Sequence, residues 1–357
     1  MNVRRFETTQ IDPFLRGEEL GRAFADGIAA NIAGYSELFD VVGVTAGDLP
    51  GLGLIAIERI EGWRADLADE LRGLAAGSGR EPWELGMLNA RTEILATVGA
   101  IGEGECSTSV FLPETGAPRT VQTWDWHDVS NDDTLVVRYR TPGGRVVRYF
   151  TEFGILGKIG VNSDGIGVHF NILNHAEDGN GIGVPVHSVA RGVLDGAGTL
   201  EEAVAIALSA EVTASTVLTI VSVSAAGAQA VSVELSPGGH ATVLPSDGGL
   251  LLHTNHFLDS RLAAGELVPD TSSSYRRLDR LRERRTTLSS SDPLQRVAGM
   301  LLHEADGAPV CCHPDPHLAF EHRWQTLLTI SLDLEQSQLQ FHEGGPCTAA
   351  WDSWQVF

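Results

Sequence analysis

The spacing of apolar residues separates a helical first part of the chain from a strand-rich remainder. Between residues 55 and 75, apolar side chains recur every three or four positions, which predicts an amphipathic helix. Pro82 then stands where the first turn of a helix accepts proline, ahead of the segment from Trp83 to Asn89. The first hundred residues are therefore predicted to be mostly helical.

From about residue 105 the pattern changes to β-branched residues in alternating runs that are separated by glycine-containing turns. The runs 135–140 and 146–150 predict one hairpin, and 158–170 predicts a second with its turn at Ser163-Asp164-Gly165. Further strands are expected at 217–223, 230–235, 326–332 and 338–342. Further helices are expected at 200–209, with Thr199 as the N-cap candidate, and at 274–285. Because strands and helices come in runs rather than in strict alternation, we expect an α+β protein with largely antiparallel sheets.

Composition and charge exclude several classes of protein. Hydrophobic residues make up 43% of the chain and charged residues 20%, which is typical of a globular protein. A formal net charge of −22 disfavours binding to nucleic acid or to an anionic membrane surface. The sequence has neither a visible signal peptide nor an apolar run of about 18 residues, so we expect a soluble cytoplasmic protein with reduced thiols.

One of the four cysteines, Cys106, lies where the helical pattern of the sequence gives way to the strand pattern. It follows Gly102-Glu103-Gly104-Glu105 and precedes a predicted strand that begins with small hydroxyl residues. Most free cysteines are small buried core residues, and that interpretation stays open for Cys106. The alternative is a nucleophile that is fixed on a rigid strand, with an exposed peptide bond before it.

A set of short motifs completes the second interpretation. They are Arg16-Gly17-Glu18-Glu19-Leu20-Gly21, Leu88 to Ile94, Glu105-Cys106-Ser107-Thr108, Thr123-Trp124-Asp125-Trp126, Gly157 to Asn162, His253-Thr254-Asn255-His256-Phe257, Cys312-His313-Pro314-Asp315 and Gly344-Gly345-Pro346-Cys347. In this order and spacing the chain resembles the acyl-coenzyme A:6-aminopenicillanic acid acyltransferase family, a branch of the N-terminal nucleophile hydrolases. The resemblance covers nearly the whole length.

The resemblance implies a single domain over residues 1–357 with a four-layer αββα sandwich fold. It also implies an inactive precursor that cuts itself between Glu105 and Cys106. The products would be a mostly helical α fragment, 1–105, and a β fragment, 106–357, that carries the nucleophile. The two fragments are expected to stay associated.

The chemistry of such a cut can be argued from ordinary pKa values. A free thiol has a pKa of about 8.5, whereas a free α-amino group titrates at about 7.7–8.0 and can accept the thiol proton near neutral pH. Before the cut the nitrogen of Cys106 is an amide and cannot act as a base. Cleavage would therefore activate the enzyme.

The resemblance also implies the other catalytic residues. Asp125 would orient the new amine, Asn255 would stabilise the oxyanion, and Arg277 would contribute through a Ser-x-x-Arg element that begins at Ser274. From the residues alone, Asp125 is equally a turn or cap residue, Asn255 a strand-end residue and Arg277 part of a solvated helix face. Arg276, one position earlier, leaves the arginine assignment open.

The aromatic residues around Asp125 are candidates for a substrate pocket. Trp124, Trp126 and His127 would form its walls, and ordinary core packing is the alternative for both tryptophans.

No metal site or cofactor is expected. His253 and His256 flank Asn255, but no third ligand stands at a usual zinc spacing. Cys311-Cys312-His313 is disfavoured as a site because adjacent cysteines chelate one ion poorly and no second cysteine pair is near.

Three functions stay open at this point. The first is an amidohydrolase that cleaves a small-molecule amide through a thioester on Cys106. The second is an acyltransferase that moves an acyl group from coenzyme A or from an amide to a small amine. The net charge of −22 disfavours a coenzyme A thioester as co-substrate, although a local basic patch around Arg276 and Arg277 would favour it. The hydrolase is preferred. The third is an unprocessed, non-catalytic binding protein.

Overall fold

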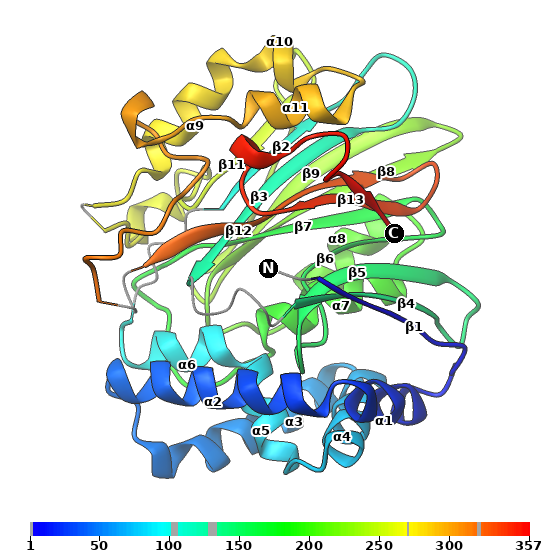
Figure 1. The fold of residues 1–357 in the computed structure, drawn as a ribbon, viewed down its shortest axis with the longest axis vertical. Coiled ribbons are helices and arrows are strands. Elements are labelled where there is room, and N and C mark those ends of the chain that lie inside the picture. Colours follow the sequence, from blue (N-terminus) through cyan, green and yellow to red (C-terminus); the bar gives the residue numbers. More distant parts are fainter. Residues whose placement is uncertain (1–2, 101–105, 128–133, 270, 320–322) are drawn as a thin grey trace.

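Two stacked β-sheets form the centre of the protein, with helices on both outer sides (Figure 1). The computed structural model describes residues 3–100, 106–127, 134–269, 271–319 and 323–357. Glu105, the residue predicted to precede the cut, lies outside these ranges.

Within the described residues the larger sheet has eight strands in the order β1-β4-β5-β6-β7-β8-β9-β10. They are β1 (Arg4–Glu7), β4 (Thr134–Arg140), β5 (Val146–Glu152), β6 (Ile159–Asn162), β7 (Ile166–Ile172), β8 (Thr216–Ser224), β9 (Gly227–Ser236) and β10 (Gly239–Val243). All neighbouring strands are antiparallel except β1, which pairs with β4 in parallel. Both predicted hairpins are confirmed, and Gly165 takes a positive φ of 83° in the turn between β6 and β7.

The smaller sheet has six antiparallel strands in the order β11-β2-β3-β12-β13-β14 within the same residues. They are β2 (Ser107–Phe111), β3 (Arg119–His127), β11 (Leu250–His253), β12 (Trp324–Asp333), β13 (Gln338–Glu343) and β14 (Gln355–Val356).

The helices form two groups around the sheets. Those before the first cysteine are α1 (Pro13–Ala23), α2 (Ala25–Val41), α3 (Leu49–Trp63), α4 (Ala65–Ser78), α5 (Pro82–Asn89) and α6 (Arg91–Thr97). The later ones are α7 (Val186–Gly196), α8 (Leu200–Leu208), α9 (Ser274–Glu283), α10 (Arg285–Leu288) and α11 (Pro293–Gly299). The N-cap predicted at Thr199 is confirmed, because its hydroxyl accepts from the backbone N–H of Glu202 at the start of α8.

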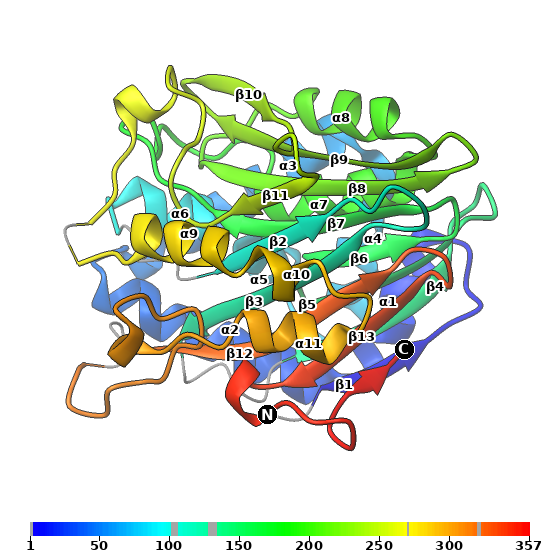
Figure 2. The same ribbon diagram turned by 90° about the horizontal axis from the view of Figure 1, so that it is seen from above.

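The order of the layers follows from which elements touch. Helices α7 and α8 pack on strands β6 to β9 of the larger sheet, whereas α9, α10 and α11 pack on β2, β3 and β11 (Figure 2). The two sheets meet face to face through β2 against β7 and through β12 and β13 against β5 and β6. The expected four-layer αββα arrangement is therefore confirmed, and α1 to α6 form a further group at one end (Figure 1).

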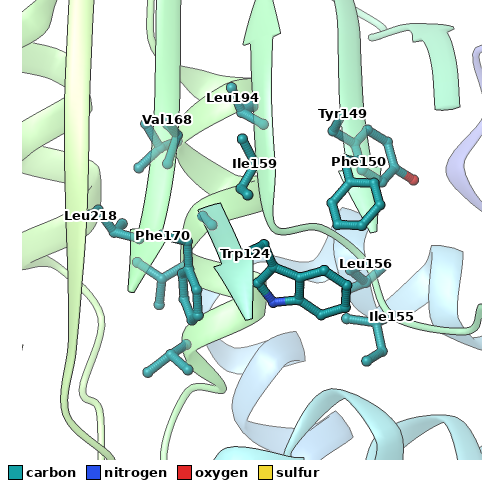
Figure 3. Close-up of a cluster of buried hydrophobic side chains, with 14 of the residues drawn as sticks. Trp124, Tyr149, Phe150, Ile155, Leu156, Ile159, Val168, Phe170, Leu194 and Leu218 are labelled. Carbon is teal, nitrogen blue, oxygen red and sulfur yellow. The ribbon is translucent and has the colours of Figure 1, made fainter. Parts of the chain in front are cut away.

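The space between the sheets and the first helices is filled by the main apolar core. Trp124 lies in it, surrounded by residues such as Phe150, Ile159 and Phe170 (Figure 3). Its ring packs edge-on against Phe150, with the ring centroids 5.2 Å apart.

Two local features differ from the sequence prediction. The amphipathic segment 55–75 is not one helix, because Arg64 is extended (φ −146°, ψ 91°) and separates α3 from α4. The Arg64 guanidinium binds the Asp66 carboxylate and the carbonyl of Gly192, contacts that support the break. The other difference is β1, a strand in a part of the chain predicted to be mostly helical.

The Arg16-Gly17 motif has a packing role. A Cβ on Gly17 would lie 2.1 Å from the carbonyl oxygen of Glu70, so glycine allows α1 and α4 to touch backbone to backbone. The Arg16 and Arg191 side chains both bind the buried Glu70 carboxylate, with Arg191 Nη2 at 2.6 Å from Oε2. This buried ion cluster joins the first helices to α7.

None of the helices in the described ranges combines the length and the apolar character that crossing a membrane requires.

Candidate active site

Cys106 lies directly before β2 and is buried. The antiparallel register places Ser107 opposite Thr123 on β3, which brings Cys106 beside Asp125. The backbone N–H of Asp125 points at Cys106 Sγ with N and S 3.4 Å apart, and Sγ is 3.6 Å from the Asp125 carbonyl oxygen. The thiol is thus held against the backbone of the neighbouring strand.

The surroundings of the thiol favour its protonated form at neutral pH. Burial, reinforced by the nearby Asp125 carboxylate, raises the pKa of Cys106 to about 12, although the charges of Lys158 and Arg277 act in the opposite direction. Forming a thiolate at neutral pH therefore requires transfer of the thiol proton to a base.

Arg277 connects Cys106 with Asn255. Its guanidinium donates through Nη1 to the Cys106 carbonyl oxygen at 2.9 Å and through Nη2 to Asn255 Oδ1 at 2.9 Å. Arg277 is fully buried, whereas the neighbouring Arg276 is exposed, so the structure places Arg277 and not Arg276 next to Cys106. The solvated-face interpretation of Arg277 is therefore wrong.

Asn255 is buried and held on three sides. Its backbone N–H donates to Ser274 Oγ at 2.8 Å, and its Oδ1 accepts from Arg277. The side-chain Nδ2 donates one hydrogen to the carbonyl of Ile172 at 3.0 Å. A primary amide carries two N–H hydrogens, so the second N–H is available to another acceptor.

The three aromatic pocket candidates fall into different environments. Trp124 packs in the core, with Lys158 Nζ 4.0 Å from its ring centroid. A cavity lies next to Trp126, and Trp124 does not line it. Trp126 does line that cavity and packs edge-on against Trp324. His127 is buried with its ring tilted over Trp324, 4.4 Å between centroids, and is not among the lining residues.

The cavity beside this group has a volume of about 250 Å³. Its walls are mainly apolar, with Leu95, Trp126, Ile172 and Leu267 among them. Polar groups come from Thr92, Asn174, His175 and Asp178. Ile172 connects it with Asn255, because the carbonyl of Ile172 accepts the Asn255 amide. A small apolar group fits this space.

Two residues near Cys106 were missed by the sequence analysis. Asn171, on β7, donates through Nδ2 to the Cys106 carbonyl at 3.0 Å. Lys158 is fully buried and bonds to Glu152, and burial together with the Arg91 charge lowers the pKa of Lys158 to about 7. Lys158 could have been found from the sequence, because it is a single charged residue between the apolar Leu156 and Ile159. No neighbouring residue distinguishes Asn171 in the same way.

The two histidines beside Asn255 have hydrogen-bond partners within the protein. His253 Nε2 lies 2.9 Å from Glu234 Oε1, and His256 Nδ1 lies 2.7 Å from Ser274 Oγ. His256 also stacks on Tyr275. These contacts account for both side chains.

Glu93, in the motif before Cys106, is a buried carboxyl group with a testable effect on stability. Its Oε1 accepts from the Val186 backbone N–H at the start of α7, and burial raises the pKa of Glu93 to about 7. Because its pKa in the folded state lies above its unfolded value, the folded state binds more protons, and stability falls as the pH rises from about 4.5 to about 7.

We expect Glu93→Gln to remove this dependence. Above pH 7 the variant should be more stable than the wild type by up to about 3 kcal/mol, and below pH 4.5 the difference should vanish. Denaturant unfolding from pH 4 to pH 8 measures it. Parallel stability curves for the two proteins would show that Glu93 titrates normally.

Comparison with known proteins supports the resemblance seen in the motifs. A curated relative, the 40 kDa form of acyl-coenzyme A:6-aminopenicillanic-acid-acyltransferase from Emericella nidulans, is 28% identical over 245 residues, which are 68% of this chain and 65% of the relative. The matched region thus spans less than two thirds of that relative.

Two solved structures align with part of this chain. Penicillin V acylase from Agrobacterium tumefaciens aligns with a TM-score of 0.47 and 18% identity over 67% of this chain and 83% of its own. A variant of conjugated bile acid hydrolase from Clostridium perfringens aligns with a TM-score of 0.43 and 12% identity over 70% of this chain and 92% of its own.

The family model for acyl-coenzyme A:6-aminopenicillanic acid acyl-transferase matches residues 113–347. The match includes Asp125, Asn255 and Arg277 and begins after Cys106. Since it extends over more than half of the chain, the protein belongs to the acyl-coenzyme A:6-aminopenicillanic acid acyl-transferase family.

Proposed function

We propose that the protein is a self-processing N-terminal cysteine amidohydrolase that cleaves a small-molecule amide through a thioester on Cys106. The observation that supports this most directly is the pair of hydrogen bonds from the buried Arg277 guanidinium, one to the Cys106 carbonyl oxygen and one to Asn255 Oδ1. A thiol at the start of a strand, with an amide donor beside it, is suited to acyl transfer.

Processing is the first reaction in this proposal. Cys106 Sγ attacks the carbonyl carbon of Glu105, and the thiol proton passes to the departing nitrogen of Cys106. The C–N bond breaks, a thioester forms, and water then hydrolyses it to the Glu105 carboxylate and a free thiol. Cys106 is left as a new N-terminus with a basic amine.

Turnover repeats this sequence on an external amide. The new α-amine takes the proton from Sγ, and Asp125 orients that amine. Sγ attacks the substrate carbonyl carbon, the Asn255 N–H stabilises the oxyanion, and the leaving amine departs with the proton. Water hydrolyses the acyl-enzyme, and no cofactor is needed.

We assign the cavity lined by Trp126 to the acyl group of the substrate. Its apolar walls fit a small apolar acyl group better than a charged one. The proposed substrates are therefore amides of small apolar carboxylic acids.

The second candidate is the acyltransferase, in which an amine rather than water takes the acyl group from Cys106. The family and the relative from Emericella nidulans, which is named as an acyltransferase, favour it. The acyl donor would then be a coenzyme A thioester or an amide, and the net charge of −22 disfavours the thioester.

Intact mass measurement and electrophoresis under denaturing conditions test the proposal. We expect two fragments that divide before Cys106, and a thioester adduct on the larger one when a slow amide substrate is added. Product masses with and without coenzyme A thioesters and amines separate hydrolysis from transfer. A full-length chain whose Cys106 stays unreactive to iodoacetamide would instead support a non-catalytic binding protein.

A further inference from the structure

Four potential metal ligands meet on the side of the molecule that carries the last strands. They are His303, Cys311, His313 and Cys347, and their ligand atoms all lie within 4.8 Å of one another. All four belong to the described residues, and both cysteines are free thiols. This group takes no part in the proposed acyl-transfer chemistry.

Two of the six ligand–ligand distances match a tetrahedral site. His313 Nε2 lies 3.7 Å from Cys311 Sγ and 3.5 Å from Cys347 Sγ, and the rings of His303 and His313 have centroids 5.2 Å apart. Zinc bonds of about 2.3 Å to sulfur and 2.0–2.1 Å to nitrogen separate tetrahedral ligand atoms by about 3.3–3.8 Å. Small side-chain shifts are enough to reach this geometry.

The backbone brings the ligands together from separate segments. His303 precedes the short helix η4 (Glu304–Asp306), and the Leu302 carbonyl accepts hydrogen bonds from the N–H groups of Val310 and Cys311. Cys347 lies in the short helix η6 (Pro346–Thr348). A Cβ on Gly345 would lie 2.7 Å from Cys311 Sγ, so glycine allows the η6 segment to approach so closely.

This arrangement changes the interpretation of Cys311-Cys312-His313. The two adjacent cysteines do not have to share an ion, because Cys312 points elsewhere, with its Sγ 3.3 Å from the Trp324 carbonyl oxygen. The second sulfur comes from Cys347, too far along the chain to form a spacing motif.

We propose that His303, Cys311, His313 and Cys347 bind one Zn²⁺ ion in a structural Cys₂His₂ site. Two thiolates and two neutral imidazoles give a net neutral centre with Zn²⁺, and this donor set favours zinc among the common divalent ions. Binding releases the two thiol protons to solvent. Four protein ligands leave no open position for substrate, so the ion would be structural rather than catalytic.

The site would join the last segment of the chain to the strands behind Asp125. Cys312 bonds to Thr326 on β12 through its N–H and its carbonyl, and Thr326 pairs with Asp125 on β3. A zinc ion would therefore hold η6 and the 303–313 segment against the same strand pair that positions Asp125.

Metal analysis of the full-length protein, purified without chelators, tests the site. We expect about one zinc per chain in the wild type and in Cys312→Ser, and loss of the metal in Cys347→Ser, whose side chain is exposed in the wild type. Cobalt exchanged into the wild type should give the intense visible bands of tetrahedral Co²⁺ and a thiolate charge-transfer band. A Cys106→Ala variant should keep both signals, which separates this site from the nucleophile.

Thermal unfolding provides a second measurement. A chelator should lower the midpoint of the wild type and of Cys312→Ser by several degrees and leave Cys347→Ser unchanged. The proposal is overturned by a wild type that takes up neither zinc nor cobalt under reducing conditions, or by equal metal content in Cys347→Ser. An intact mass lower by two hydrogens, without metal, would overturn it in favour of a Cys311–Cys347 disulfide.

Discussion

Replacing Cys106 by alanine is expected to leave a single uncut chain without activity. The substitution removes the atom that would attack both Glu105 and the substrate, while the small side chain keeps the start of β2 packed. Removal of the nucleophile in a comparable hydrolase costs about 10⁶-fold in turnover, so activity should fall to background. Denaturing electrophoresis with intact mass, followed by an amide hydrolysis assay, measures both effects.

Two further variants sharpen this experiment. Cys312→Ser, which changes another free thiol of the chain, should be cut and active like the wild type. Cys106→Ser should be cut slowly, because a hydroxyl is a poorer nucleophile than a thiolate. Normal cleavage of Cys106→Ala would mean that another group starts the reaction.

Replacing Asn255 by alanine should lower turnover by about 10²–10³-fold, which is the usual cost of losing one oxyanion donor. The effect should lie mainly in kcat, because the N–H is proposed to act on the transition state. Steady-state kinetics on the processed enzyme, with circular dichroism to verify the fold, measures it.

The matched control is Asn255→Asp. Aspartate keeps an oxygen for Arg277 but has no side-chain N–H, so it separates the donor from the structural contact. We expect a loss at least as large as for Asn255→Ala, since the carboxylate would also repel an oxyanion. Turnover at the wild-type level in both variants would place the oxyanion donor elsewhere.

Local signals predicted the regular elements well. The hairpins β4–β5 and β6–β7 and the cap at Thr199 depend on neighbouring residues, and all three are confirmed. The break at Arg64 was missed, because its contact with Gly192 comes from a distant helix. The strand β1 was missed because four residues, three of them charged, give no clear alternation.

The candidate site was harder to predict from residue types alone. Asp125, Asn255 and Arg277 were selected through the resemblance to a family, since each has an ordinary local explanation. Asn171 reaches Cys106 only because β7 lies across from β2 in the facing sheet, a contact that no spacing along the chain encodes.

The parallel pairing of β1 with β4 has a consequence for the purified enzyme. A cut before Cys106 would leave β1 still bonded to β4, with the Thr8 N–H donating to the Arg138 carbonyl at 3.0 Å, and Glu70 still bonded to Arg191. Scission would thus yield an intertwined heterodimer rather than a discarded propeptide. The larger subunit expressed alone would lack a strand and a counter-ion, so co-expression of both halves should be needed to obtain it in soluble form.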